Sequence, residues 1–188
     1  MALAGSYSTT TRDQLRREIE DTRTAFHQLL ASIPVDAYRL PTDNPAWNVG
    51  QVLYHMSLAP RLLGGDAKMI RGQSRLLRLV PAVVPRRLFD WLNKEWTRTR
   101  ARNPSPAFLA GEYDKAHAAA LRALAETDDA DFQLRVHYPD WDPLLSGDVT
   151  LERLFHYVKA HFDSHAGQLR QTVTGQQDSR SSSDGKAQ

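Results

Sequence analysis

Residues 151–170 read Leu151-Glu-Arg-Leu-Phe-His-Tyr-Val-Lys-Ala-His-Phe-Asp-Ser-His-Ala-Gly-Gln-Leu-Arg170. The apolar side chains recur at the spacing of one helix face, at Leu151, Leu154, Phe155, Val158, Phe162 and Leu169. This period predicts an amphipathic helix with one buried face. His161 and His165 stand four residues apart, about one helical turn, within the same stripe. The sequence therefore predicts two imidazoles that point the same way into the protein.

Two buried imidazoles need partners, because an unpaired polar group in a protein core costs free energy. A single divalent metal ion would bind both. A lone histidine on an apolar face is more often a hydrogen-bonded core residue, so a third inward histidine would strengthen the metal hypothesis.

The segment Trp47-Asn-Val-Gly-Gln-Val-Leu-Tyr-His-Met-Ser-Leu-Ala59 supplies that third histidine. Asn48 and Gln51 have the spacing of a capping box, which predicts a helix start at residue 48. One face of this helix then carries Val52, His55, Ala59 and Leu62. His55 is therefore expected to point inward. Three imidazoles that leave a coordination position open are typical of a catalytic metal site.

Length and composition place the chain among globular proteins. Its 188 residues favour one domain, and its hydrophobic fraction is 41%. No apolar run approaches the about 20 residues that cross a bilayer, and the first residues do not resemble a secretion signal. The chain has no cysteine, which excludes disulfides, thiolate ligands and a cysteine nucleophile. We expect a cytoplasmic protein, and the net charge of +2 gives no reason to expect nucleic-acid binding.

Two further helices are predicted around these histidine-bearing segments. The first begins at Thr9, ends before Pro34 and has an apolar stripe at Leu15, Ile19, Thr22, Phe26, Leu29, Leu30 and Ile33. Another follows Pro104-Ser105-Pro106, with its stripe at Leu109, Tyr113, His117, Ala120 and Leu124. Residues 131–149 are expected to form a loop, with at most a short extended piece at 132–138. Residues 1–8 and the polar tail 174–188 are expected to be disordered.

The other histidines and the nearest acid are weaker candidates. His27 is interpreted as a surface residue, because it lies off the apolar stripe of its helix. His117 could approach the metal from the apolar face of its helix, although the role of a core histidine bonded to a neighbour is favoured. His137 depends on how its loop folds. His156 lies about 140° around the helix from His161 and should not join the site. Asp163 points off the face of the histidine pair.

Residues 64–103 are interpreted as a basic insert. Gly64-Gly65 is expected to break the preceding helix, and the segment from Arg61 to Arg102 holds eleven Lys and Arg. An apolar run at 76–84 precedes a predicted short helix that carries Phe89, Trp91, Leu92 and Trp96. The insert could cover one end of the helical domain, bind an anionic ligand or touch a membrane surface. The first interpretation is favoured.

The two histidine segments together resemble the DinB/YfiT-like family of metal-binding four-helix bundles. Its members show Trp-Ser/Thr-x-x-Glu-x-x-x-His and His-x-x-x-His-x-x-Gln, which this chain matches at Trp47 to His55 and at His161 to Gln168. Asn48 and Gln51 replace the usual hydroxyl and acid. The resemblance implies an all-α four-helix bundle over residues 9–173, with a partly helical insert between the second and third core helices.

The same resemblance implies a divalent metal, zinc or nickel, on His55, His161 and His165, and frequently a homodimer. Some relatives are S-transferases or isomerases that use bacillithiol, mycothiol or glutathione. We therefore expect a metal-dependent enzyme that transfers a low-molecular-weight thiol to an electrophilic small molecule. Arginines of residues 61–102 could hold carboxylates of the thiol or the substrate. The alternative is a non-catalytic bundle that binds a metal or a ligand.

Overall fold

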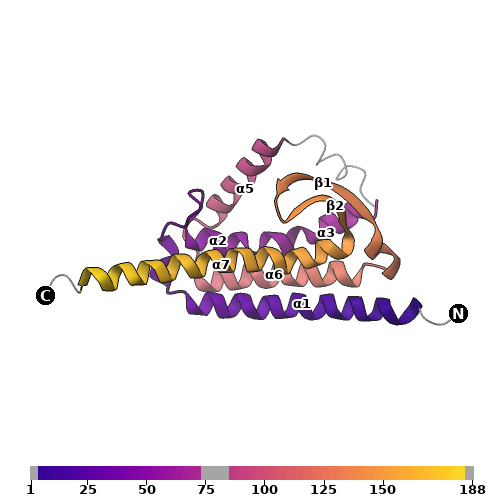
Figure 1. The fold of residues 1–188 in the computed structure, drawn as a ribbon, viewed down its shortest axis with the longest axis horizontal. Coiled ribbons are helices and arrows are strands. Elements are labelled where there is room, and N and C mark those ends of the chain that lie inside the picture. The colour runs from indigo at the N-terminus through magenta and orange to yellow at the C-terminus, as the bar shows by residue number, and fades with distance from the viewer. Residues whose placement is uncertain (1–3, 73–84, 185–188) are drawn as a thin grey trace.

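The protein is mostly helical, which agrees with the predicted all-α class. Among the described residues it also contains one small β-hairpin (Figure 1). The computed structural model describes residues 4–72 and 85–184. Its α-helices are α1 (Ala4–Ser32), α2 (Val49–His55), α3 (Leu58–Ile70), α5 (Arg86–Arg100), α6 (Pro106–Ala125) and α7 (Leu151–Asp184). The 3-10 helices are η1 (Val35–Arg39) and η2 (Asp129–Gln133), and the strands are β1 (Arg135–Asp142) and β2 (Leu145–Thr150).

Helices α1, α3, α6 and α7 pack side by side and enclose the hydrophobic core. Both α1 and α3 contact α6 and α7. The apolar stripes predicted for α1, α6 and α7 are buried at every predicted position. Phe26 of α1 stacks on Tyr113 of α6 with ring centroids 3.9 Å apart. The helical periodicity of the sequence therefore identified the buried faces of these three helices correctly.

Two predicted helix starts are confirmed by their caps. The Asn48 side chain accepts a hydrogen bond from the Gln51 backbone N–H, and the Gln51 side chain accepts one from the Asn48 N–H. At the start of α6 the Ser105 hydroxyl accepts from the Phe108 N–H. These bonds satisfy backbone donors that a helix start leaves without partners.

The predicted break at Gly64-Gly65 is wrong, because α3 runs through both glycines to Ile70. The helix is instead interrupted between α2 and α3, where residues 56 and 57 form a turn. Pro60 explains this position, since proline has no N–H for a bond four residues back and its ring clashes with that carbonyl. The break also changes the buried face: Leu62 is 56% exposed, whereas Leu63 is buried.

Residues 135–150 form an antiparallel hairpin where a loop was predicted. Arg135 pairs with Thr150 and Asp142 pairs with Leu145, and the register is irregular between Tyr138 and Asp142. In the turn, the Asp142 carboxylate accepts from the Leu144 N–H. The prolines that suggested a loop are tolerated because a two-stranded sheet consists of edge strands and the register shift interrupts its ladder.

Both terminal helices are longer than predicted. Helix α1 begins at Ala4 rather than Thr9, and α7 continues through the tail expected to be disordered, to Asp184. In Figure 1 the C-terminal part of α7 extends past the neighbouring helices. Once a helix is nucleated, each added residue gains a backbone hydrogen bond, and this tail contains no proline to stop it.

Helix α5 is the predicted short helix of the insert, and it leans away from the other helices (Figure 1). It contacts α2 and β1. Its exposed apolar side chains are Leu88, Trp91, Leu92 and Trp96. The apolar run at 76–84 lies outside the described residues. No helix among the described residues has the length and hydrophobicity to cross a membrane.

Candidate metal centre

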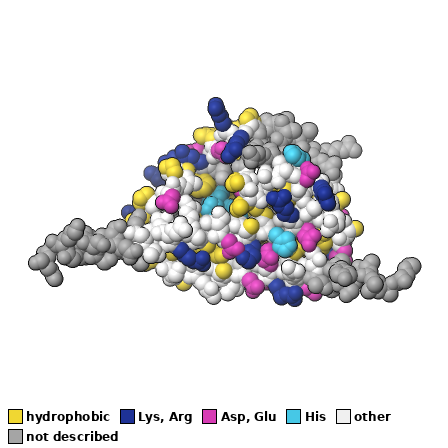
Figure 2. Space-filling model, in the orientation of Figure 1, with side chains coloured by type: hydrophobic (Ala, Val, Ile, Leu, Met, Phe, Trp, Pro, Cys, Tyr) yellow, Lys and Arg dark blue, Asp and Glu magenta, His cyan; other side chains and the backbone are white. Residues whose placement is uncertain are grey.

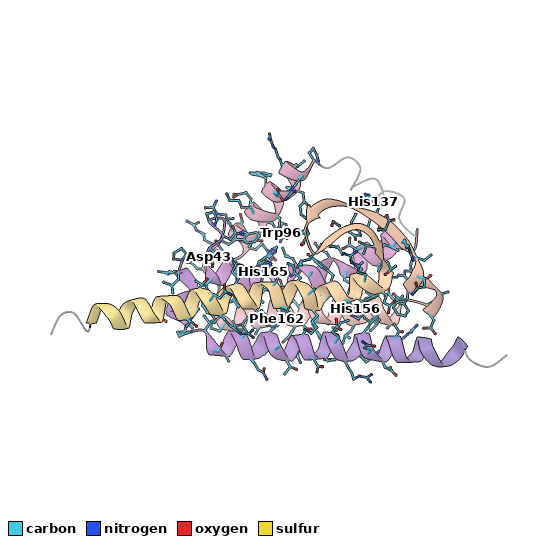
Figure 3. The ribbon with its side chains drawn as sticks, viewed as in Figure 1. Asp43, Trp96, His137, His156, Phe162 and His165 are labelled. Atoms are coloured by element: carbon cyan, nitrogen blue, oxygen red, sulfur yellow. The ribbon has the colours of Figure 1, made fainter. Side chains whose placement is uncertain are left out.

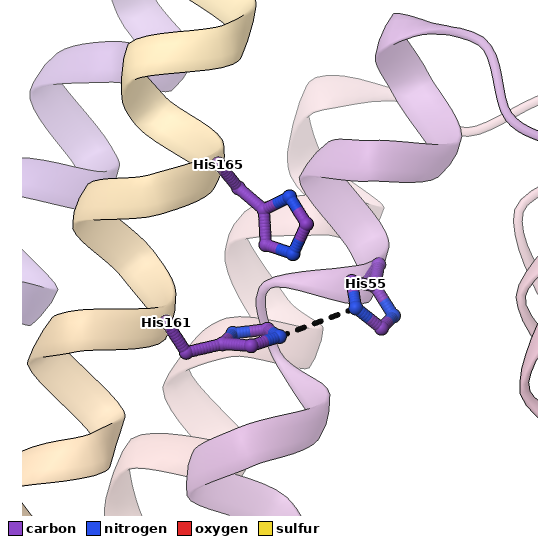
Figure 4. Close-up of side chains that lie close together, drawn as sticks. All are labelled: His55, His161 and His165. Atoms are coloured by element: carbon purple, nitrogen blue, oxygen red, sulfur yellow. Dashed lines mark hydrogen bonds between the residues drawn. The ribbon is translucent and has the colours of Figure 1, made fainter. Parts of the chain in front are cut away.

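Three imidazole rings from two helices meet inside the protein. His55 is the last residue of α2, and His161 and His165 lie one turn apart on α7 (Figure 4). The Nε2 atoms of His55 and His161 are 3.2 Å apart. The three residues each offer a ring nitrogen within 4.8 Å of the other two. The structure thus brings together all three histidines that the sequence analysis selected.

Burial keeps these imidazoles neutral. His55 is 8% and His161 4% exposed, whereas His165 is only partly buried. Burial lowers the pKa of His161 to about 3, helped by the neighbouring His165. The pKa of His55 is also held well below its usual value, by burial and then by the other two rings. Neutral rings keep a nitrogen lone pair, which is the form that binds a metal.

Neighbouring side chains fix the orientation of two of the rings. The Trp47 indole packs against His55 with ring centroids 4.3 Å apart and the ring planes tilted by 31°. His165 Nδ1 lies 3.3 Å from the Gln168 side-chain oxygen. Because a carbonyl oxygen can only accept, Nδ1 carries the proton of His165 and Nε2 keeps its lone pair. The motif from His161 to Gln168 therefore contains both a histidine of the cluster, His165, and the glutamine that sets its tautomer.

The cluster fits a divalent metal ion. Two nitrogens bound to one tetrahedral zinc ion stand about 3.3 Å apart, close to the 3.2 Å between His55 and His161. The Nδ1 atoms of these two rings are buried and have no hydrogen-bond partner among the described residues. Two neutral rings that face each other through Nε2 can share only one proton, whereas a cation between them would accept both Nε2 lone pairs and leave the proton of each ring on Nδ1.

Residues 18–169 match the sequence profile of the DinB superfamily. This chain belongs to the DinB superfamily. The fold is similar to the crystal structures of a mycothiol-dependent maleylpyruvate isomerase and of an alanine mutant of it. The mutant gives a TM-score of 0.62 at 11% identity, and the isomerase itself 0.60 at 13%. Both alignments cover 84% of this chain but only 60% of the isomerase chain. A comparison with curated proteins finds no match.

In this DinB-superfamily protein the other four histidines lie outside the cluster and pair with carboxylates. Three of them bridge α1 to its neighbours: His156 to Glu18, His117 to Glu20 and His27 to Asp114. The fourth, His137, is exposed on the hairpin and pairs with Asp148. His117 is thus the core histidine bonded to a neighbour that the sequence analysis favoured. The exclusion of His156 and Asp163 from the site also agrees with the structure, because Asp163 is exposed and pairs with Lys159.

Two residues near the cluster, Tyr157 of α7 and Asp142 of the hairpin, were missed by the sequence analysis. The Tyr157 ring lies 5.4 Å from that of His161, and its hydroxyl donates to the Asp142 carboxylate at 2.5 Å. Asp142 also opposes the burial effect that lowers the pKa of His165. Tyr157 precedes His161 by four residues, so its helix face was readable. Asp142 was not, because residue 142 was assigned to a loop.

Proposed function

We propose that this protein is a divalent-metal-dependent enzyme that joins a low-molecular-weight thiol to an electrophilic small molecule, as an S-transferase or an isomerase. The observation that carries the proposal is the cluster of buried, neutral imidazoles with 3.2 Å between two Nε2 atoms. Membership of the DinB superfamily and the likeness to mycothiol-dependent isomerase structures support it. Because this chain spans only part of those isomerases, their substrate is not carried over.

His55, His161 and His165 would hold the metal, with α1, α3, α6 and α7 as a four-helix bundle around it and α5 as an insert. When bound, zinc or nickel would lower the pKa of a coordinated thiol so that the thiolate forms at neutral pH. The chain has no cysteine of its own, so the thiol must come from a cosubstrate. Gln168 keeps the Nε2 lone pair of His165 available, and Trp47 holds the His55 ring.

The surroundings of the cluster define where a substrate can enter. His55 and His161 are closed off from solvent, whereas His165 is partly exposed. In Figures 2 and 3, which share one orientation, a histidine reaches the surface in the middle of this face, where Figure 3 labels His165. We therefore assign the exposed edge of His165 as the entrance of the site.

Arg61, one of the arginines considered for carboxylate binding, is already engaged. Its guanidinium bonds to the buried Glu112 carboxylate at 2.8 Å, and Lys115 bonds to the other oxygen of the same carboxylate. This arrangement ties α3 to α6, and it lowers the pKa of Glu112 mainly through the Arg61 bond. We therefore assign Arg61 a structural role and do not propose it as a carboxylate-binding residue.

The function is tested with full-length protein purified without a histidine tag and loaded with zinc or nickel. Mycothiol, bacillithiol and glutathione are offered separately with a chlorodinitrobenzene electrophile, and formation of the thioether is measured. We expect conjugation with at least one thiol, a fall to the background rate in His161→Ala, and normal rates in His156→Ala. His156 is a matched control on the same helix that pairs with Glu18. Metal binding without turnover with any thiol would instead indicate the non-catalytic metal-binding bundle.

A further inference from the structure

Trp96 differs from the other exposed apolar residues of α5, because its ring is held in place. The indole N–H donates a hydrogen bond to the Tyr54 hydroxyl at 3.2 Å. Tyr54 is buried and directly precedes His55 in the sequence. Even so, Trp96 remains 54% exposed. A rigid, half-exposed indole offers a flat surface for stacking with little entropy left to lose.

Contacts of α5 place this helix close to the histidine cluster. The Trp47 ring, which packs against His55, directs its N–H at the Lys94 carbonyl of α5 at 3.5 Å. Helix α5 also contacts β1, and the last residue of that strand, Asp142, raises the pKa of His165 against the larger effect of burial. In the view of Figure 3 Trp96 and His165 lie close together in projection, and Figure 2 shows hydrophobic side chains around the exposed histidine. Helix α5 and the end of β1 thus both lie close to the histidine cluster.

A cation accompanies the indole. The Arg100 guanidinium lies over the Trp96 ring, 5.7 Å from its centroid. Its neighbour on the same helix, Arg98, instead forms an ion pair with Glu95. Among the described residues no carboxylate lies within ion-pair distance of Arg100. Helix α5 therefore presents an aromatic surface together with a guanidinium that can bind an anion.

We propose that Trp96 and Arg100 bind the electrophilic substrate, and that this substrate is a planar aromatic carboxylate. Its ring stacks on the Trp96 indole and its carboxylate pairs with Arg100, which directs the molecule towards the histidine cluster. That the bound molecule is a substrate rests on the proposed function. The binding site itself is formed by residues of α5. Tyr54 acts as a positioning residue, because it fixes the indole without facing the ligand.

Binding is measured by calorimetry on the zinc-loaded full chain, with naphthoate, neutral naphthol and cyclohexanecarboxylate as probes. Wild type is expected to bind naphthoate saturably and cyclohexanecarboxylate more weakly. Trp96→Ala is expected to weaken naphthoate binding by about three- to tenfold, with an intermediate loss in Trp96→Phe. Arg100→Gln is expected to weaken the binding of naphthoate and leave that of naphthol unchanged.

Trp91→Ala is the matched control, since Trp91 is 57% exposed on the same helix. Equal losses in Trp91→Ala and Trp96→Ala, equal affinities for the planar and the non-planar acid, or no saturable binding in wild type would each overturn the inference. The assay requires no turnover, so it is separable from the test of the proposed function. Conjugation that fails in a protein with Trp96-dependent naphthoate binding counts against the enzyme alone.

Discussion

His55 Nε2 and His161 Nε2 lie 3.2 Å apart although 106 residues separate them in the chain. One ring ends α2 and the other lies in the middle of α7, so this pair exists only when the two helices are packed. A metal bound there would connect them directly. Metal affinity and the stability of the fold are therefore expected to be linked, since an ion that binds only the folded state stabilises it.

The first prediction concerns metal content and stability. Full-length protein is expected to bind one zinc or nickel ion per chain, measured by elemental analysis, and His55→Ala to lose it. His156→Ala should keep the ion, because His156 is paired with Glu18 away from the cluster. At a hundredfold excess of metal over its dissociation constant, the free energy of unfolding should rise by about 2.7 kcal/mol. A similar rise in His55→Ala would show that the metal binds elsewhere.

The second prediction concerns the metal-free protein in acid. The pKa of His161 is lowered to about 3 by burial, and those of His55 and His165 are lowered too, so the unfolded chain takes up protons that the folded one does not. This contribution is fully present above about pH 6.5 and is lost as the pH falls towards 3. Each such histidine lowers the free energy of unfolding by up to about 1.4 kcal/mol for each pH unit below its unfolded pKa. Urea unfolding should therefore show a loss on the order of 2–4 kcal/mol between pH 7 and pH 5.

His161→Leu is expected to reduce this acid sensitivity, whereas His137→Ala, on the exposed hairpin, should leave it at the wild-type value. An unchanged slope in His161→Leu would contradict the assignment of the buried ring as its source.

The third prediction concerns Asp66, a partly buried acid on α3 that interacts with Tyr138 and Tyr157. Burial raises its pKa to about 7, against the opposing effect of the Tyr138 hydroxyl. The pH dependence of stability is therefore opposite to that of the histidines. The stabilisation that the protonated Asp66 gives below the ordinary pKa of aspartate is lost as the pH rises towards 7. Asp66→Asn should raise the free energy of unfolding at pH 8 by on the order of 1–3 kcal/mol. The gain should vanish near pH 4, and a gain independent of pH would exclude titration as its cause.

The fourth prediction compares two helical glycines. A Cβ on Gly50 of α2 would lie 2.8 Å from Pro104 Cγ and 3.3 Å from the backbone oxygen of Tyr38. A Cβ on Gly65 of α3 would meet no atom within 4 Å. Gly50→Ala should therefore lower the free energy of unfolding by about 1–3 kcal/mol and shift the helix that carries His55. Gly65→Ala should raise it by about 0.5–1 kcal/mol. Thermal melts of both variants test this contrast, which equal effects would refute.

The elements that the sequence predicted well are those governed by local periodicity and capping. The stripes of α1, α6 and α7 follow from side chains three or four residues apart, and the Asn48 and Ser105 caps from bonds within one turn. Two local features were nevertheless misjudged. Pro60 rather than Gly64-Gly65 interrupts the helix, and the hairpin at 135–150 forms in spite of its prolines. At Pro60 the backbone restriction of proline decides where the helix is interrupted, whereas in the hairpin strand pairing outweighs the turn preference of the prolines.

The amino-acid sequence by itself determined which faces of the helices are apolar and that His55, His161 and His165 lie on those faces. It could do so because the helix period is fixed by backbone geometry. Tertiary structure alone decided that the three rings come within reach of one ion, that His165 has the exposed edge, and that α5, which carries Trp96, packs on the helix that ends in His55. Those distances depend on how α2, α5 and α7 pack against one another, and no spacing along a single helix contains that information.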